Sequence, residues 1–341
     1  MSSPSFDPQR RNFLKKLGVG ALALWGGQTA LLKASETSGS KASGSAFPQR
    51  KFGRHDFMVS AMSLGGHTLA TASDEKESFR IVHEAVDQGM TFMDNSWDYH
   101  NGRSEDLMGK ALVGRRDKVF LMTKVCNHGS GGKKESLKML DESLRRLKTD
   151  HLDLWQWHAV ASMEQVEHGF RPDSVVEALD EAKKQGKTRF IGFTGHTEPD
   201  VHLAVLKHQH PFDACQLPLN PIDANADAFQ RKVLPELLRQ KIAVLAMKTL
   251  LGNANPIRDG VLTVPEALRY AFSLPVTTIV SGIKSMEELR QNMDLARNFQ
   301  PMSAEEMLAL ETRCRPALEK NSYEPYRKWM TYRDGDSSRY V

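Results

Sequence analysis

The chain has 341 residues, 40% hydrophobic and 26% charged, which is typical of a soluble globular protein with one large domain or two ordinary ones. The formal net charge is +4, and it comes from residues 1–34, where five basic side chains accompany one acidic side chain. Residues 35–341 are therefore formally neutral, which argues against a basic face that binds nucleic acid.

The first 34 residues carry a targeting pattern. Arg10 and Arg11 precede Phe-Leu-Lys and then an apolar run, Leu17–Gly27, that is too short and too glycine-rich to span a membrane comfortably. The paired arginines resemble the twin-arginine (Tat) export signal, although Gln9 replaces the usual Ser or Thr. An uncleaved anchor or a chance amphipathic start is the alternative. We expect a signal peptide at 1–34, transient contact with the Tat machinery and a periplasmic or otherwise exported protein, with no stable membrane span after cleavage.

A regular alternation of strands and helices follows a Ser- and Gly-rich segment at 35–46, which we expect to be a flexible linker. Phe47–Val59 predicts a β-hairpin that turns at Gly53 and plugs the base of a barrel. The predicted barrel strands are Ser60–Leu64, Met90–Met93, Val119–Thr123, Leu152–Trp157, Arg189–Phe193, Ala214–Leu217, Ile242–Met247 and Val276–Val280. The predicted helices are Glu75–Gln88, Ser104–Leu112, Lys133–Leu147, Pro172–Gln185, Pro199–Lys207, Asp227–Gln240, Val264–Phe272 and Met286–Asn298.

This alternation predicts an α/β protein with a single (β/α)8 TIM-barrel domain over residues 47–318. A C-terminal tail at 319–341 contains five aromatic residues among charges. It could cover the barrel mouth and shape the substrate pocket, or pack as an arm elsewhere on the surface.

Polar side chains follow three consecutive predicted strands. Asp94 ends the strand Met90–Met93, Lys124 follows the next strand, and His158 follows the one after. Tyr99 lies on the loop five residues beyond the aspartate. Singly, such residues are more often a helix cap, a solvated charge or a core histidine. In a parallel barrel, however, the carboxyl ends of the strands converge on one mouth. A Tyr can donate a proton near neutral pH only if its pKa is held down, and a nearby Lys is the usual means.

The segment from Asp94 to Leu112, D-N-S-W-D-Y-H-N-G-R-S-E-D-L-M-G-K-A-L, resembles the signature of the aldo-keto reductases. The resemblance covers Phe47–Arg315 and is densest at 91–112 and 276–292. It implies an NAD(P)-dependent oxidoreductase that acts on aldehyde, ketone or alcohol groups of a small molecule. The four polar residues resemble that family's catalytic tetrad. By resemblance Tyr99 donates the proton, Lys124 is oriented by Asp94 and stabilises the phenolate, and His158 positions the carbonyl.

The same resemblance supplies candidate residues for the nicotinamide, since no GxGxxG follows a first strand and a Rossmann site is absent. The carboxamide would be held at Thr194, Gly195 and His196 together with Gln216. Most reductases of the family have Ser-Asn where this chain has Gly-His. A methionine, Met247, stands where the family stacks an aromatic ring on the nicotinamide, and a thioether can pack against an aromatic face. Lys248 follows it.

The phosphates would bind between the last strand and its helix, where aligned N–H groups favour anions. The candidate residues there are Ser281, Gly282, Lys284, Glu288 and Asn292. Glu288 stands where many family members carry an Arg, and we expect Lys284, four residues earlier, to share its helix face. A Lys cannot form the bidentate fork of an Arg. We therefore expect NADP(H) to be preferred by a small margin, with NAD(H) as the second cofactor. Alone, this segment would be an ordinary connection with Ser285 as a helix cap.

No metal site is expected from the local spacing. The cysteines Cys126, Cys215 and Cys314 are scattered, and His208 and His210 precede a strand at the wrong end for barrel chemistry. Two other classes of function stay open: a nucleotide-binding sensory or regulatory subunit of the same fold with slow turnover, and a barrel metallohydrolase that uses histidines. The sequence does not indicate the substrate. Additional candidate pocket walls are Trp97, Trp157 and His128.

Overall fold

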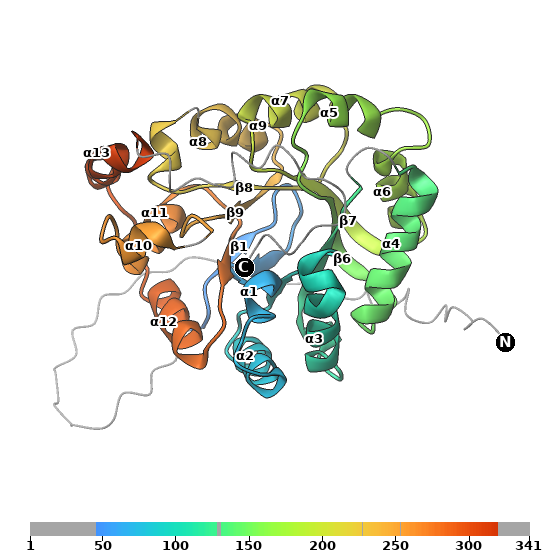
Figure 1. Cartoon of the computed structure of the whole chain (residues 1–341), viewed down its shortest axis with the longest axis horizontal. Helices are drawn as coiled ribbons and strands as arrows, with labels where there is room; N and C mark the ends of the chain where they lie inside the picture. Colours follow the sequence, from blue (N-terminus) through green and yellow to red (C-terminus); the bar gives the residue numbers. More distant parts are fainter. Residues whose placement is uncertain (1–45, 128–130, 227, 253, 320–341) are drawn as a thin grey trace, which may run out of the picture. The chain divides into compact units, whose positions relative to one another are not determined.

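A computed structural model describes residues 46–127, 131–226, 228–252 and 254–319. The predicted signal peptide at 1–34, the linker up to residue 45 and the tail from 320 onward lie outside these described residues. Within them, eight parallel strands close into a barrel in the order β10-β3-β4-β5-β6-β7-β8-β9. Helices surround the strands (Figure 1). The predicted (β/α)8 barrel is confirmed.

The barrel strands are short and follow the chain in order. They are β3 (Met62–Gly65), β4 (Phe92–Asp94), β5 (Phe120–Val125), β6 (Leu152–Trp157), β7 (Thr188–Thr194), β8 (Ala214–Pro218), β9 (Ala243–Met247) and β10 (Thr278–Gly282). Every neighbouring pair is parallel, including the closing pair of β10 and β3. The carboxyl ends of all eight strands therefore open on the same side of the barrel.

The helices alternate with these strands. They are α1 (Gly66–Leu69), α2 (Glu75–Asp87), α3 (Arg103–Ala111), α4 (Lys133–Arg146), α5 (Met163–Gly169), α6 (Val175–Lys184), α7 (Pro199–Lys207), α8 (Phe229–Lys232), α9 (Leu234–Arg239), α10 (Asn255–Arg258), α11 (Val264–Ser273), α12 (Met286–Arg297) and α13 (Ala304–Glu319). Short 3-10 turns lie at Tyr99–Gly102, Arg116–Lys118 and Asp223–Asn225.

Several helices begin at a side-chain cap that the sequence encodes. Asp74 accepts a hydrogen bond from the backbone N–H of Glu77 at the start of α2. Thr263 and Glu266 form a reciprocal capping box at the start of α11. Such caps satisfy N–H groups that have no partner within the helix, and each contributes about 1 kcal/mol.

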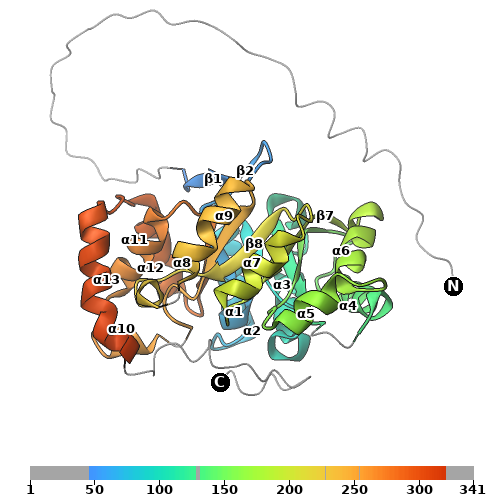
Figure 2. The same cartoon turned by 90° about the horizontal axis from the view of Figure 1, so that it is seen from above.

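The N-terminal hairpin closes the base of the barrel, as expected. Strands β1 (Gln49–Lys51) and β2 (Met58–Ser60) pair antiparallel and lie across one end of the barrel (Figure 2). Phe52, in the turn, is fully buried in a cluster that includes Phe92 and Phe120, the first residues of β4 and β5. Gly53 has φ +53°, and a Cβ there would lie 2.7 Å from the backbone nitrogen of Ala243, so only glycine fits.

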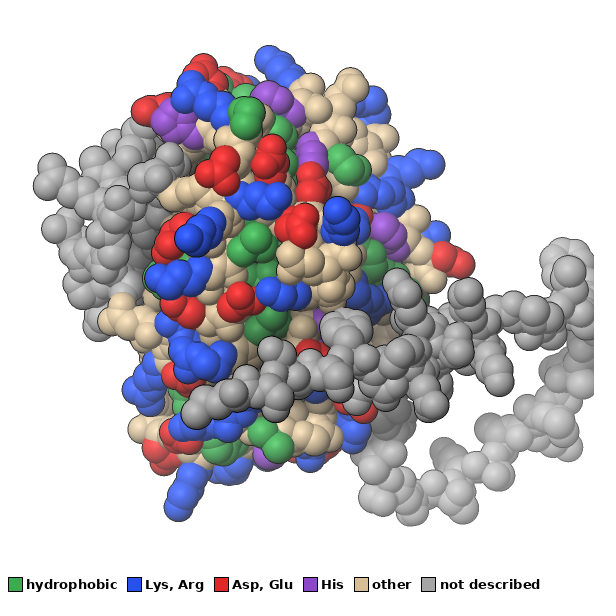
Figure 3. All heavy atoms as spheres, turned by 90° about the vertical axis from the view of Figure 1, so that its right-hand side faces the viewer, with side chains coloured by type: hydrophobic (Ala, Val, Ile, Leu, Met, Phe, Trp, Pro, Cys, Tyr) green, Lys and Arg blue, Asp and Glu red, His purple; other side chains and the backbone are tan. Residues whose placement is uncertain are grey.

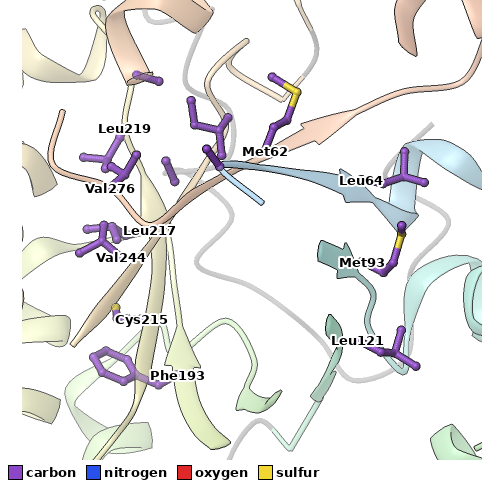
Figure 4. Close-up of a cluster of buried hydrophobic side chains, with 14 of the residues drawn as sticks. Met62, Leu64, Met93, Leu121, Phe193, Cys215, Leu217, Leu219, Val244 and Val276 are labelled. Carbon is purple, nitrogen blue, oxygen red and sulfur yellow. The ribbon is translucent and has the colours of Figure 1, made fainter. Parts of the chain in front are cut away.

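The main core lies between the barrel and its helices. Strand side chains that point outward meet the apolar faces of the helices, and Figure 4 shows labelled members of this cluster on β3, β4, β5, β7, β8 and β9. Examples are Leu64, Leu121, Phe193 and Val244, each at most 1% exposed. Complete burial of such side chains contributes roughly 1.5–3 kcal/mol each. The strands are held by this layer, so their polar carboxyl ends keep fixed positions.

The prediction of one continuous helix over Asp227–Gln240 was wrong. The sequence predicted one helix over Asp227–Gln240, but the structure has α8 and α9 with Val233 between them. Pro235 lies in the first turn of α9, where its missing N–H costs nothing, whereas in a continuous helix it would conflict with the preceding turn. The helices α1, α5, α10 and α13 were not predicted.

The surface carries charges of both signs side by side, as the face in Figure 3 illustrates. Many of them form exposed pairs such as Arg80 with Glu77 and Lys110 with Glu75, which typically contribute less than about 1 kcal/mol each. Among the described residues, none of the helices combines the length and apolar character needed to cross a bilayer.

Candidate active site

The ammonium group of Lys124 is the centre of the polar cluster at the barrel mouth. Lys124 lies in β5 and is 1% exposed. Its Nζ donates hydrogen bonds to Asp94 Oδ2 at 2.8 Å, to the backbone carbonyl of Asn95 at 2.6 Å and to the hydroxyl of Tyr99 at 3.2 Å. All three N–H donors of the buried ammonium group thus have acceptors: the Asp94 carboxylate, which is its counter-ion, a backbone carbonyl and the Tyr99 phenol.

A second set of hydrogen bonds holds Asp94 from the opposite side. Gln216 of β8 donates from Nε2 to Asp94 Oδ2 at 3.3 Å, and Gln156 of β6 donates to Gln216 Oε1 at 3.1 Å. All three side chains are at most 2% exposed. The predicted nicotinamide-binding residue Gln216 therefore also orients the aspartate.

The loop that carries Tyr99 has an unusual backbone. His100 and Asn101 have positive φ angles of 50° and 56°, and Gly102 has φ 86°. A Cβ on Gly102 would lie 2.4 Å from Cζ of Arg146, so the close approach requires glycine. Arg146 Nη1, in turn, donates to the backbone carbonyl of Trp97 at 2.9 Å.

Glu105 holds Arg146, the residue that contacts the loop, in place. It is fully buried, pairs with Arg146 at 3.2 Å and accepts a hydrogen bond from Thr123 at 2.6 Å. Burial is the main cause that raises the pKa of Glu105, and the hydrogen bond from Thr123 opposes it. The Glu105–Arg146 pair thus ties α3 to α4 beneath Tyr99. This pair was not predicted, because no local pattern in the sequence distinguishes it from surface charges.

His158 lies at the end of β6 and is 8% exposed. Its Nδ1 is 3.1 Å from Ser96 Oγ, 3.1 Å from Cys126 Sγ and 3.6 Å from Asp98 Oδ1. Its ring lies edge-on to Tyr99, with centroids 5.8 Å apart. The predicted tetrad is therefore assembled at one site. The three residues around Nδ1 were not predicted, and Cys126 was noted only as one of three scattered cysteines.

Two further basic residues shape the electrostatics of the mouth. His67, on α1, lies edge-on to Tyr99 at 5.1 Å. Burial, followed by the nearby His100, lowers the pKa of His67 to about 4, so its ring is neutral at pH 7. Burial, followed by the charge of Lys124, lowers the pKa of Lys248 to about 8. The site thus concentrates positive charge on Lys124 and Lys248, which favours anionic groups.

The predicted nicotinamide residues lie at neighbouring strand ends. Thr194 ends β7, and the N–H of Gly195 donates to the carbonyl of Gln216 at 3.3 Å. A Cβ on Gly195 would meet the carbonyl oxygen of Val160 at 2.5 Å and His202 Cε1 at 2.7 Å. This packing explains why glycine replaces the serine expected from the family resemblance. His196 follows at the mouth, half-buried, and Met247 ends β9.

At the predicted phosphate segment, Ser281 and Gly282 end β10, and Asn292 Nδ2 donates to Ser281 Oγ at 3.0 Å. The expectation that Lys284 and Glu288 share a helix face is wrong. Helix α12 begins at Met286 after the cap Ser285, so Lys284 precedes the helix.

The carboxylate of Glu288 caps the chain in front of α12. It accepts the backbone N–H of Lys284 at 2.8 Å, and Glu77 of α2 accepts the N–H of Met286 at 3.1 Å. Ser285 itself has extended φ and ψ angles of −140° and 157° and turns the chain away from the helix axis. Two carboxylates therefore lie at this helix N-terminus beside the exposed Lys284.

Of the additional candidate pocket walls, Trp157 lines a cavity together with Asn127, Gly132 and Gly169. Trp157 points toward α5, where a Cβ on Gly169 would lie 2.1 Å from its ring, so it belongs to the outer core. Trp97 donates from Nε1 to Glu142 of α4 at 2.9 Å. His128 lies outside the described residues.

Comparisons with known proteins identify the family of this chain. The profile of the Aldo/keto reductase family matches residues 61–255. The chain is 26% identical over 312 residues to the uncharacterized oxidoreductase YqkF of Bacillus subtilis, with 80% of this chain and 98% of that protein covered. It is 29% identical over 211 residues to the methylglyoxal reductase YeaE of Escherichia coli, with 61% and 70% covered.

Among solved structures, the aldo-keto reductase AKR11C1 from Bacillus halodurans in its holo form superposes with a TM-score of 0.67 and 24% identity, covering 82% of this chain and 99% of that chain. A parallel eight-stranded barrel with a buried Asp–Lys pair, a Tyr hydroxyl on that Lys and a histidine at its mouth is the architecture of a barrel oxidoreductase. The chain belongs to the aldo/keto reductase family. Membership places it among the NAD(P)H-dependent oxidoreductases.

Proposed function

We propose that this protein reduces the carbonyl group of a small aldehyde or ketone, with Tyr99 as the proton donor. The observation that carries the proposal is the position of Lys124, whose Nζ lies 2.8 Å from Asp94 Oδ2 and 3.2 Å from the Tyr99 hydroxyl. A cation at that distance favours the phenolate that proton donation leaves behind. The aspartate keeps the cation in place, so the arrangement is preorganised.

Each of the four residues has one task in this proposal. The Tyr99 O–H gives its proton to the carbonyl oxygen as the carbonyl carbon is reduced, and solvent later returns a proton to the phenolate. Lys124 stabilises that phenolate, and Asp94 fixes Lys124. His158, with Nδ1 directed at Ser96 and Cys126, presents its other ring nitrogen to the carbonyl oxygen. Alcohol oxidation would use the same groups in reverse.

A bound NADPH or NADH would supply the hydride. Hydroxyl, amide and backbone groups at Thr194, Gly195 and Gln216 form a donor and acceptor set that suits a carboxamide, and Gln216 contacts Asp94, the partner of Lys124. Met247 and Lys248 would border the ring, and His196 would replace the family's asparagine. At the other end, Lys284 offers the charge for a 2′-phosphate.

The preference between the two cofactors follows from the charges near Lys284. The carboxylates of Glu288 and Glu77 oppose a further phosphate there, although both accept hydrogen bonds from backbone N–H groups. A single lysine, which cannot form the bidentate hydrogen bonds of an arginine, gives only a small gain in affinity for the 2′-phosphate. We therefore propose NADP(H) as the favoured cofactor by a small margin over NAD(H).

The test is a screen of aldehydes and ketones with NADPH and with NADH, followed at the absorbance of the reduced nicotinamide. The proposal predicts turnover of a reactive aldehyde by the purified protein. If bound NADPH survives a large excess of every carbonyl compound, the protein acts as a nucleotide-binding regulatory subunit and the proposal fails.

We also propose that the protein is exported in folded form by the Tat route. Support comes from the paired arginines, Arg10 and Arg11, before a short apolar run in a segment outside the described residues. A cofactor loaded in the cytoplasm requires a route that passes folded protein, which links this proposal to the nicotinamide site.

A further inference from the structure

Three side chains that can bind a metal meet beside the predicted tetrad. Asp98 lies in the loop after β4, Cys126 directly follows β5, and His158 directly follows β6. Their ligand atoms, one carboxylate oxygen, Sγ and a ring nitrogen, all lie within 4.8 Å of one another. The residues are about thirty positions apart in the sequence, so no local metal motif exists.

The two separations from His158 Nδ1 lie close to the edges of a zinc tetrahedron, and the third, between Cys126 Sγ and the Asp98 carboxylate, is within 4.8 Å. Zinc bonds of about 2.3 Å to sulfur and about 2.0–2.2 Å to nitrogen and oxygen place tetrahedral ligand atoms about 3.4–3.6 Å apart. Here Cys126 Sγ is 3.1 Å and Asp98 Oδ1 is 3.6 Å from His158 Nδ1. Side-chain shifts of a few tenths of an ångström therefore suffice at the nitrogen.

The backbone holds these positions independently of any ion. The N–H of Trp97 donates to the carbonyl of Lys124 at 3.2 Å, and the N–H of His158 donates to the carbonyl of Val125 at 3.0 Å. These bonds join the three strand ends that carry the cluster. Ser96 Oγ, 3.1 Å from His158 Nδ1 and 3.6 Å from Cys126 Sγ, adds a hydroxyl on the same side.

We propose that Asp98, Cys126 and His158 form a binding site for a borderline-soft divalent cation, with Zn²⁺ as the best match. Thiolate and imidazole ligands select zinc over magnesium or calcium, and three protein ligands leave a fourth position for water. A cation on Nδ1 leaves the ring proton of His158 on Nε2. The ion would therefore fix the tautomer of a residue in the predicted tetrad. Binding itself does not depend on the proposed reaction.

Cobalt spectroscopy of the purified, chelator-treated full-length chain tests this site. Co²⁺ should bind in a single equivalent, with a thiolate-to-cobalt charge-transfer band and the intense visible bands of a tetrahedral site, and Zn²⁺ should displace it. Cys126→Ser should abolish the charge-transfer band. Asp98→Asn, which leaves the thiol in place, should weaken binding at least about tenfold.

The other two cysteines supply matched controls. Cys215 and Cys314 are fully buried elsewhere, so Cys215→Ser and Cys314→Ser should keep the band of the parent chain. The proposal is overturned if the parent chain shows no thiolate–cobalt band, or if the band survives in Cys126→Ser. Equal affinity of Asp98→Asn and the parent chain would also overturn the three-ligand site. Because the readout is spectroscopic, carbonyl reduction can fail or succeed without changing these outcomes.

Discussion

Replacement of His202 by leucine should remove much of the acid sensitivity of the fold. His202 lies on α7 behind the nicotinamide loop and is fully buried, between the rings of Phe193 and Phe229. Burial lowers its pKa from 6.5 to about 4, partly opposed by a backbone group of Glu198. Below pH 6.5 the unfolded chain binds this proton, whereas the folded protein binds it only near pH 4. Protonation of His202 therefore does not lower the free energy of unfolding above pH 6.5, and it lowers that free energy progressively as the pH falls from 6.5 toward 4.

The size of the effect follows from the pKa difference between the two states. Each pKa unit corresponds to 1.36 kcal/mol, so a displacement from 6.5 to about 4 removes up to about 3 kcal/mol from the free energy of unfolding. Urea unfolding at pH 7, 6, 5 and 4 measures it. The slope between pH 6.5 and 4 should be smaller in His202→Leu than in the parent chain by about this amount. His208→Gln, at the exposed end of the same helix, controls for the loss of a histidine. Parallel pH profiles for the parent chain and His202→Leu would refute the reasoning.

Three further predictions concern cofactor choice, export and the loop anchor. Lys284→Ala should raise the Kd for NADPH about tenfold and leave the Kd for NADH nearly unchanged. Glu288→Gln, which keeps an acceptor for the backbone N–H, should shift the preference toward NADPH. If Lys284→Ala weakens the binding of both cofactors equally in fluorescence titrations, the 2′-phosphate does not bind at Lys284. Arg10→Lys with Arg11→Lys should leave folded protein in the cytoplasm, and undiminished protein in the periplasmic fraction would count against the Tat route. Arg146→Ala leaves a buried carboxylate unpaired and should lower the free energy of unfolding by about 3–5 kcal/mol, whereas a loss below about 1 kcal/mol in chemical denaturation would show that the pair does not anchor the loop.

The barrel was predictable because its signals are local. Most of the strands are short apolar runs followed by a polar residue, the exceptions being followed by Gly65 and Pro218, and each long helix has an apolar face at helical spacing. The basal hairpin was also predictable, since Gly53 marks a turn that only glycine fits. It was harder to predict whether the helix over residues 227–240 is continuous. Pro235 is compatible with the first turn of a helix and with a helix break, and only packing shows that α8 and α9 are separate.

The tetrad could be located because the barrel topology brings consecutive strand ends together. Asp94 and Lys124 are at their predicted positions, and the structure adds the distances that join them to Tyr99. The direction in which a side chain points at a strand end was harder to predict from the sequence. Trp157 alternates outward in β6 and packs on α5.

Contacts between distant loops were not predictable from spacing. Cys126 meets His158 only because β5 and β6 are neighbours, in a register that pairs Val125 with Trp157. The relation of Lys284 to Glu288 was misjudged for a different reason. A spacing of four residues suggests one helix face, but Ser285 caps the helix, which begins at Met286, so Lys284 precedes it.

The most direct test of the account is the rate of carbonyl reduction by Tyr99→Phe. This change keeps the ring and removes the only proton that the proposed reaction takes from the side chain. With the best aldehyde from the screen, kcat/KM should fall roughly a hundredfold or more, the scale of general acid catalysis. The Kd for NADPH should stay within about twofold, because the change keeps the ring in place and removes only a hydroxyl that contacts Lys124. A Tyr99→Phe variant that reduces the aldehyde at a rate close to that of the parent chain would contradict the central claim.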